Sequence, residues 1–97
     1  MARYISLLNW TDQGIRNAKD TVNRANAARQ AFQAGGGKII DLYWTLGQHD
    51  VVVIFEAQDD ETATRLTLSL GMKGNVRTST MRAFGEQEMA RIVQGLS

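Results

Sequence analysis

The sequence contains no cysteine and no proline. Without cysteine, the chain cannot form a disulfide framework, use a thiol nucleophile or bind a metal through thiolates, and a reducing compartment fits this absence. No apolar run approaches the roughly 20 residues that are needed to span a bilayer. Residues 1–4 lack the charged and then apolar profile of a signal peptide. We therefore expect a cytoplasmic protein without a membrane partner.

An excess of charge is also missing. Eleven basic and ten acidic residues leave a net charge of +1, and the arginines are scattered along the chain. This balance favours neither a nucleic-acid partner nor an anionic membrane surface. The chain has 97 residues, of which 43% are hydrophobic and 22% charged, which is enough for a core of its own. We expect a single domain over residues 1–97.

Hydrophobic patterns predict four strands, at residues 4–10, 38–46, 50–57 and 76–84. Thr11 and Gly35 bracket a helical stripe, which Gly14 and residues 19–21 could split into two parts. Its apolar positions are Ile15, Ala18, Val22, Ala25, Ala28 and Phe32. A second helix begins at acidic residues 59–61 and ends near Gly71. A third helix is expected over residues 86–96, with a predicted buried side consisting of Met89, Ile92, Val93 and Leu96.

The resulting order, βαββαβ followed by a helix, predicts an α+β, ferredoxin-like fold. Its four-stranded antiparallel sheet has the spatial order 4-1-3-2, with helices on one face. The other face should then be polar, but Val52 and Ile54 alternate with the equally apolar Val51, Val53 and Phe55. An apolar open face on so small a protein is typical of an interface. We therefore expect a homodimer through the open sheet face, as in a dimeric α+β barrel.

Antiparallel strand order gathers several polar and aromatic residues at one end of this sheet, where they could bind a small organic ligand. The candidate ligand-binding residues are Asn9, Trp10, Tyr43, Trp44, His49, Asp50 and Arg77. His49 could transfer a proton near neutral pH. Alternatively, His49 and Asp50 are turn residues that bond the backbone, and the aromatic residues are core or interface anchors. At the opposite end, Glu56 is expected to pair with Arg3 or Arg82 rather than to act in catalysis.

Several segments together resemble the GYD domain family: residues 9–16 (NWTDQGIR), 44–47 (WTLG), 55–57 (FEA) and 74–78 (GNVRT). The resemblance covers nearly the whole chain and implies a relation to the dimeric α+β barrels, but no defined activity. The tripeptide that names the family has a tyrosine where this chain has His49. The family's proline before the paired aspartates is Gln58 here.

Three functions remain open at this point. The first is a regulatory or ligand-binding dimer that needs no cofactor. The second, by analogy of fold alone, is a cofactor-independent oxygenase or isomerase. The third is a haem protein with His49 as the axial ligand. One histidine and no cysteine offer no recognisable set of metal ligands, so no metal site is expected.

Overall fold

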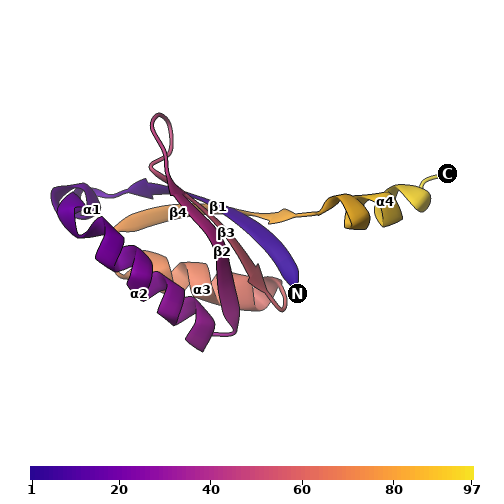
Figure 1. Ribbon diagram of the computed structural model, residues 1–97, viewed down its shortest axis with the longest axis horizontal. Coiled ribbons are helices and arrows are strands. Elements are labelled where there is room, and N and C mark those ends of the chain that lie inside the picture. The colour runs from indigo at the N-terminus through magenta and orange to yellow at the C-terminus, as the bar shows by residue number, and fades with distance from the viewer.

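The computed structural model describes residues 1–97, and Figure 1 shows four strands with helices along one side of them. The elements are β1 (Ala2–Trp10), α1 (Asp12–Arg16), the 3-10 turn η1 (Ala18–Asp20), α2 (Thr21–Ala34), β2 (Gly37–Trp44), β3 (Val51–Ala57), α3 (Asp60–Met72), β4 (Val76–Ala83) and α4 (Glu86–Gln94). All neighbouring strands are antiparallel, in the order β2-β3-β1-β4. This is the predicted order read from the other edge, so the ferredoxin-like prediction is confirmed. None of the helices has the length and hydrophobicity needed to cross a membrane.

One face of the sheet is covered by helices and forms the core. Alternate residues of β1 and β3 point to this face and are buried, because successive side chains of a strand point to opposite sides. Phe55 is fully buried, and its ring packs against two others. The ring of Tyr4 is stacked on it at 5.2 Å and the edge of Phe32 meets it at 5.1 Å, measured between ring centroids. These contacts join β1, β3 and α2.

The intervening residues of the same strands form the open face. Ile5 pairs with Ile54 and Leu7 pairs with Val52 across the β1–β3 ladder, and all four are half-buried within one chain. Tyr43 and Met81 extend this apolar surface onto the edge strands β2 and β4. The expectation of a sheet that is apolar on both faces is therefore correct.

Capping residues position the first and third helices. Thr11 caps α1 as predicted, because its hydroxyl accepts a hydrogen bond from the Gly14 amide. Asp59 caps α3 by accepting from the Thr62 amide at 2.9 Å, and this bond lowers the pKa of Asp59. The helix α3 ends at Met72, close to the predicted end. The chain then turns at Gly74, whose φ of +86° only glycine adopts without strain.

Two predictions of burial are wrong. Ile15 and Val22 are more than half exposed, because the helical segment breaks at η1 and α1 and α2 do not share one stripe. The second error concerns the C-terminal helix, which ends at Gln94 rather than at residue 96 and whose predicted buried side was Met89, Ile92 and Val93 with Leu96. None of its residues is buried, and the helix extends away from the body of the domain (Figure 1).

Candidate functional site

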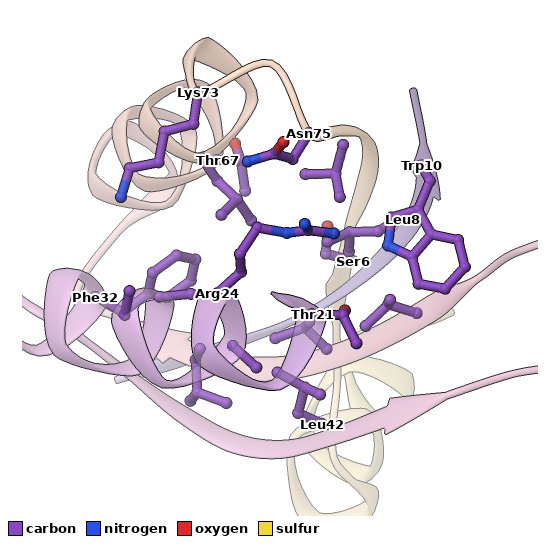
Figure 2. A pocket seen from close by; sticks show the side chains of 18 of the residues that line it. Ser6, Leu8, Trp10, Thr21, Arg24, Phe32, Leu42, Thr67, Lys73 and Asn75 are labelled. Atoms are coloured by element: carbon purple, nitrogen blue, oxygen red, sulfur yellow. The ribbon is translucent and has the colours of Figure 1, made fainter. Parts of the chain in front are cut away.

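A cavity of about 120 Å³ lies between the helix-covered face of the sheet and the helices α2 and α3 (Figure 2). Its walls are mostly apolar and include Leu8 of β1, Phe32 of α2 and Leu42 of β2. Small side chains explain why this space is left open. Ser6 of β1 and Ala28 of α2 line the cavity, where larger residues would fill it.

The polar groups of the cavity are basic or neutral. Figure 2 shows the side chain of Arg24 extending from α2 across the cavity, with Lys73 and Asn75 on the far side. The half-buried Arg24 donates hydrogen bonds to the Asn17 carbonyl (2.7 Å) and the Gly14 carbonyl (3.2 Å). No aspartate, glutamate or histidine lines the cavity. The arrangement therefore favours an anionic or hydrogen-bond-accepting group on a ligand.

Close packing of α1 against residues 73–75 holds this side of the cavity together. A Cβ atom on Gly14 would lie 2.0 Å from the Asn75 carbonyl oxygen, so only glycine fits there. The Thr11 amide donates to the same oxygen at 3.1 Å. Gln13 donates to the Lys73 carbonyl (3.1 Å) and to Asn75 Oδ1 (3.0 Å). These contacts position the Gly14 carbonyl that orients Arg24.

The structure divides the predicted site residues between the two faces of the sheet. Trp10 and Trp44 point to the helix side and line the cavity, and the Trp44 indole donates to Thr21 Oγ1 at 3.0 Å. Asn9, Tyr43 and Arg77 share the parity of the open face. The reason is alternation: Asn9 precedes Trp10 and Tyr43 precedes Trp44 in their strands, so each pair points to opposite sides.

His49 and Asp50 stabilise the β2–β3 connection and do not line the cavity. His49 Nδ1 lies 2.8 Å from Asn9 Oδ1, and Asn9 Nδ2 donates to the Gln48 carbonyl at 3.0 Å. Asp50 accepts a hydrogen bond from the Trp10 amide at 2.9 Å. The polar atoms of Asn9 and Asp50 are thus engaged within the chain.

Sequence reasoning missed Arg24, Lys73 and Asn75. The one usable signal was the position of Arg24 beside Ala25, Ala27 and Ala28 in α2, where small residues leave room against the sheet. Lys73 and Asn75 gave no signal, because their placement depends on how α3 packs.

The buried Tyr4 carries a further polar group on the helix-covered face of the sheet, outside this cavity. Its hydroxyl donates to Asp60 Oδ1 at 2.7 Å. Burial and the neighbouring Asp60 carboxylate raise the pKa of Tyr4 to about 12. The phenol is therefore held in its neutral form and serves as a structural hydrogen-bond donor.

Comparison with known proteins gives a family match, a curated relative and two solved structures. The GYD domain model matches residues 4–93. The relative is the "Glutamine synthetase and cystathionine beta-lyase binding protein" of Thermus thermophilus, which is 31% identical over 84 residues, or 86% of this chain and 88% of the relative.

The crystal structure of MtbAldR superposes with a TM-score of 0.68 and 13% identity over 88% of this chain, which spans about half (52%) of that protein. The crystal structure of TTHA0845 from Thermus thermophilus superposes with a TM-score of 0.56 and 21% identity, and the match covers 88% of this chain and 95% of that one. At these identities, both structures show the shared fold alone.

Proposed function

We propose that this chain, which belongs to the GYD domain family, is a homodimeric binding module that takes a small apolar organic anion in its cavity. The name of the Thermus relative, a protein that binds two enzymes, supports a binding role over a catalytic one. The small-ligand role rests on the cavity of this chain itself.

The observation that carries the proposal is the lining of the cavity. The lining contains no carboxylate, imidazole or thiol that could act in general acid–base catalysis, and its charged groups are the Arg24 guanidinium and the Lys73 ammonium. Arg24 uses two N–H groups on backbone carbonyls, but a guanidinium has five donors in all. The Lys73 ammonium forms no salt bridge within the chain. Both cations are therefore available to a ligand carboxylate.

The volume limits the apolar part of the ligand. An apolar cavity of about 150 Å³ in another protein binds benzene, and this cavity has about 120 Å³. A single ring or a short branched chain fits this space, with its carboxylate directed toward Arg24 and Lys73. Trp10 and Trp44 would contact the apolar part, so two of the predicted ligand-binding residues keep that role in the proposal.

The dimer part of the proposal rests on the open face. Its centre consists of Ile5, Leu7, Val52 and Ile54, none of which is covered by a helix of the same chain. Charged and polar residues surround this centre, including Arg3 with Glu56 at one end and Arg77 at the other. An apolar centre within a polar rim is the usual anatomy of a protein interface.

Native mass spectrometry of freshly purified protein tests both parts, because it gives the oligomeric state and the mass of any carried ligand. A thermal-shift comparison of benzoate with the neutral benzamide then tests the charge preference. We expect benzoate to stabilise the protein more than benzamide does. The proposal of a ligand site is wrong if no ligand is carried and neither benzoate nor short branched carboxylates shift the melting temperature.

Two variants refine this test. Lys73→Gln removes one cation from the lining of the cavity and should weaken benzoate binding severalfold. The control Lys19→Gln makes the same change of charge away from the cavity and should leave benzoate binding unchanged. Ala28→Leu fills the cavity and should abolish binding. A folded Ala28→Leu protein that binds benzoate as tightly as the parent would place the site elsewhere.

A further inference from the structure

The C-terminal helix α4 is amphipathic, but it has no partner within its own chain. Met89, Ile92, Val93 and Leu96 lie at three- or four-residue steps, and each is between 44% and 73% exposed. Phe84, just before the helix, is 49% exposed. Isolated helices shorter than about 12–15 residues are marginal in water, and α4 has nine. The helix therefore needs a surface on which to pack.

Contacts at the root of α4 hold it pointing away from its own sheet (Figure 1). Arg82 of β4 pairs with Glu88 at 2.9 Å, and the other oxygen of Glu88 accepts from the Gly85 amide at 3.2 Å. The Arg82 guanidinium also lies 4.5 Å from the centre of the Phe84 ring. The Gly85–Glu88 bond caps the helix itself, and the Arg82–Glu88 pair joins α4 to the end of β4 in this orientation.

The dimensions of the chain agree with a missing partner. The radius of gyration is 14.6 Å, against about 12.5 Å expected for a compact domain of this length. The accessible surface is 6645 Å², roughly 1,100 Å² more than the about 5,500 Å² of a compact monomer of this mass. This excess is comparable to the about 800 Å² that each partner contributes to a standard stable interface.

The helix α4 begins close in the chain to the end of the open face that carries Met81. Met81 of β4 pairs with Ile5 of β1, which in turn pairs with Ile54 of β3, so all three share the open face. The chain reaches α4 five residues after Met81, through Phe84, whose ring lies against Arg82 on the Tyr4 side of β4. A partner seated on the open face would therefore meet the start of the helix. A second copy of the chain meets this requirement reciprocally, since each copy supplies both a sheet face and a helix.

We propose that α4 is an exchanged arm, which packs its apolar side onto a second copy of this chain and receives the partner's arm in return. This inference rests on the proposed homodimer and adds to it a second contact region, outside the sheet face.

Photo-crosslinking of the full chain tests the exchange. Benzoylphenylalanine is placed at position 92, on the apolar side of α4, and in a control at position 90, on the other side. After irradiation of the purified protein, mass spectrometry under denaturing conditions should show a product of twice the chain mass for position 92 and little for position 90. A product within one chain would assign α4 to its own domain. If the protein is a stable dimer but position 92 gives no crosslinked product, the surface that binds α4 belongs to a different protein. Either result overturns the proposal.

Substitutions separate the arm from the sheet face. Ile92→Asp should raise the dimer dissociation constant by at least about tenfold, while Ala90→Asp should change it by less than about twofold. If Ile54→Asp dissociates the dimer and Ile92→Asp does not, the arm proposal fails while the sheet-face dimer stands. If Ile92→Asp dissociates the dimer and Ile54→Asp does not, the sheet-face dimer fails while the arm stands. A wild-type monomer at micromolar concentration contradicts both.

Discussion

The two faces of the sheet have similar side chains but different surroundings. On the helix-covered face, Tyr4, Leu8, Val53 and Phe55 are buried in the core of a single chain. On the open face, residues of the same kind remain half-buried, and the helices that would cover them are absent. Apolar residues on one face of a strand therefore do not by themselves show whether that face is covered by helices of the same chain.

Polar groups differ between the faces in the same way. On the covered side they are paired in the interior: Ser6 Oγ lies 2.8 Å from Thr80 Oγ1, and Tyr4 bonds Asp60. On the open side they lie toward the ends of β1 and β3, where Arg3 pairs with Glu56 and Asn9 contacts His49, and on the edge strands, where Asp41 is opposite Ile54 and Ser79 is opposite Leu7. The covered face is thus internally satisfied, whereas the open face has the composition of an interface.

The largest effect is expected for Phe55→Ala on the covered face. Phe55 is fully buried between the rings of Tyr4 and Phe32, and its truncation leaves a cavity. We expect a loss of about 3–5 kcal/mol in the free energy of unfolding, measured by urea denaturation. A loss no larger than that of an exposed residue such as Leu46→Ala would contradict the assignment of this face as the core.

On the open face, Ile54→Asp should act on association first. It places an unpaired charge in the proposed interface, so the dimer dissociation constant should rise by about a hundredfold or more. Light scattering over a dilution series measures this change. Val22→Asp serves as the control, because Val22 is an exposed apolar residue on α2, away from the open face. If Val22→Asp raised the dimer dissociation constant as much as Ile54→Asp, the open face would not be the specific site of association.

Two adjacent valines provide a matched pair across the sheet. Val53 points into the core and Val52 to the open face. Val53→Ala should cost about 2 kcal/mol of unfolding free energy at every protein concentration. Val52→Ala should lower stability mainly through the dimer, so its effect should depend on protein concentration. Identical, concentration-independent losses would argue against an interface on the open face.

Tyr4→Phe should reduce stability by about 1 kcal/mol at neutral pH, because it removes the hydrogen bond to Asp60. The pKa of Tyr4 rises from 10.0 to about 12 on folding, so the folded state retains a proton that the unfolded chain loses. In the wild-type protein, the contribution of Tyr4 to the free energy of unfolding is fully present below pH 10 and is lost as the pH rises through about 12. The Tyr4→Phe protein should lack that part of the alkaline decline. Urea unfolding of both proteins at neutral and alkaline pH provides the comparison, and parallel alkaline declines would rule out this role for Tyr4.

The smallest effect is expected for Glu56→Gln, at the end of the open face. The Arg3–Glu56 pair has a distance of 2.9 Å, but the Arg3 side chain is about half exposed. A solvent-exposed pair contributes at most about 1 kcal/mol, and ligand affinity should not change. Chemical denaturation and the benzoate assay check the two expectations. Lost binding with intact stability would show that Glu56 acts in a site.

Local patterns in the sequence were sufficient for the architecture. Short apolar segments and apolar residues at three- or four-residue steps predicted the strands, most of the helices and their order, and antiparallel pairing then implied which strand ends meet. The Thr11 cap and the Arg3–Glu56 pair followed from the same information. Grouping Asn9 and Trp10 at one end of the sheet did not separate its two faces, although neighbouring residues of a strand face opposite sides.

The sequence by itself thus determined the strand order, the apolar character of both sheet faces and the amphipathic character of α4, because each is encoded in residues close together in the chain. Only the tertiary structure decided which face the helices cover, that small residues leave a cavity beside Arg24, and that α4 points away from its own domain. These properties depend on contacts such as Gly14 with Asn75 and on the direction that the chain takes after the end of β4. No local pattern specifies them, because they arise from the packing of segments that are distant in the chain.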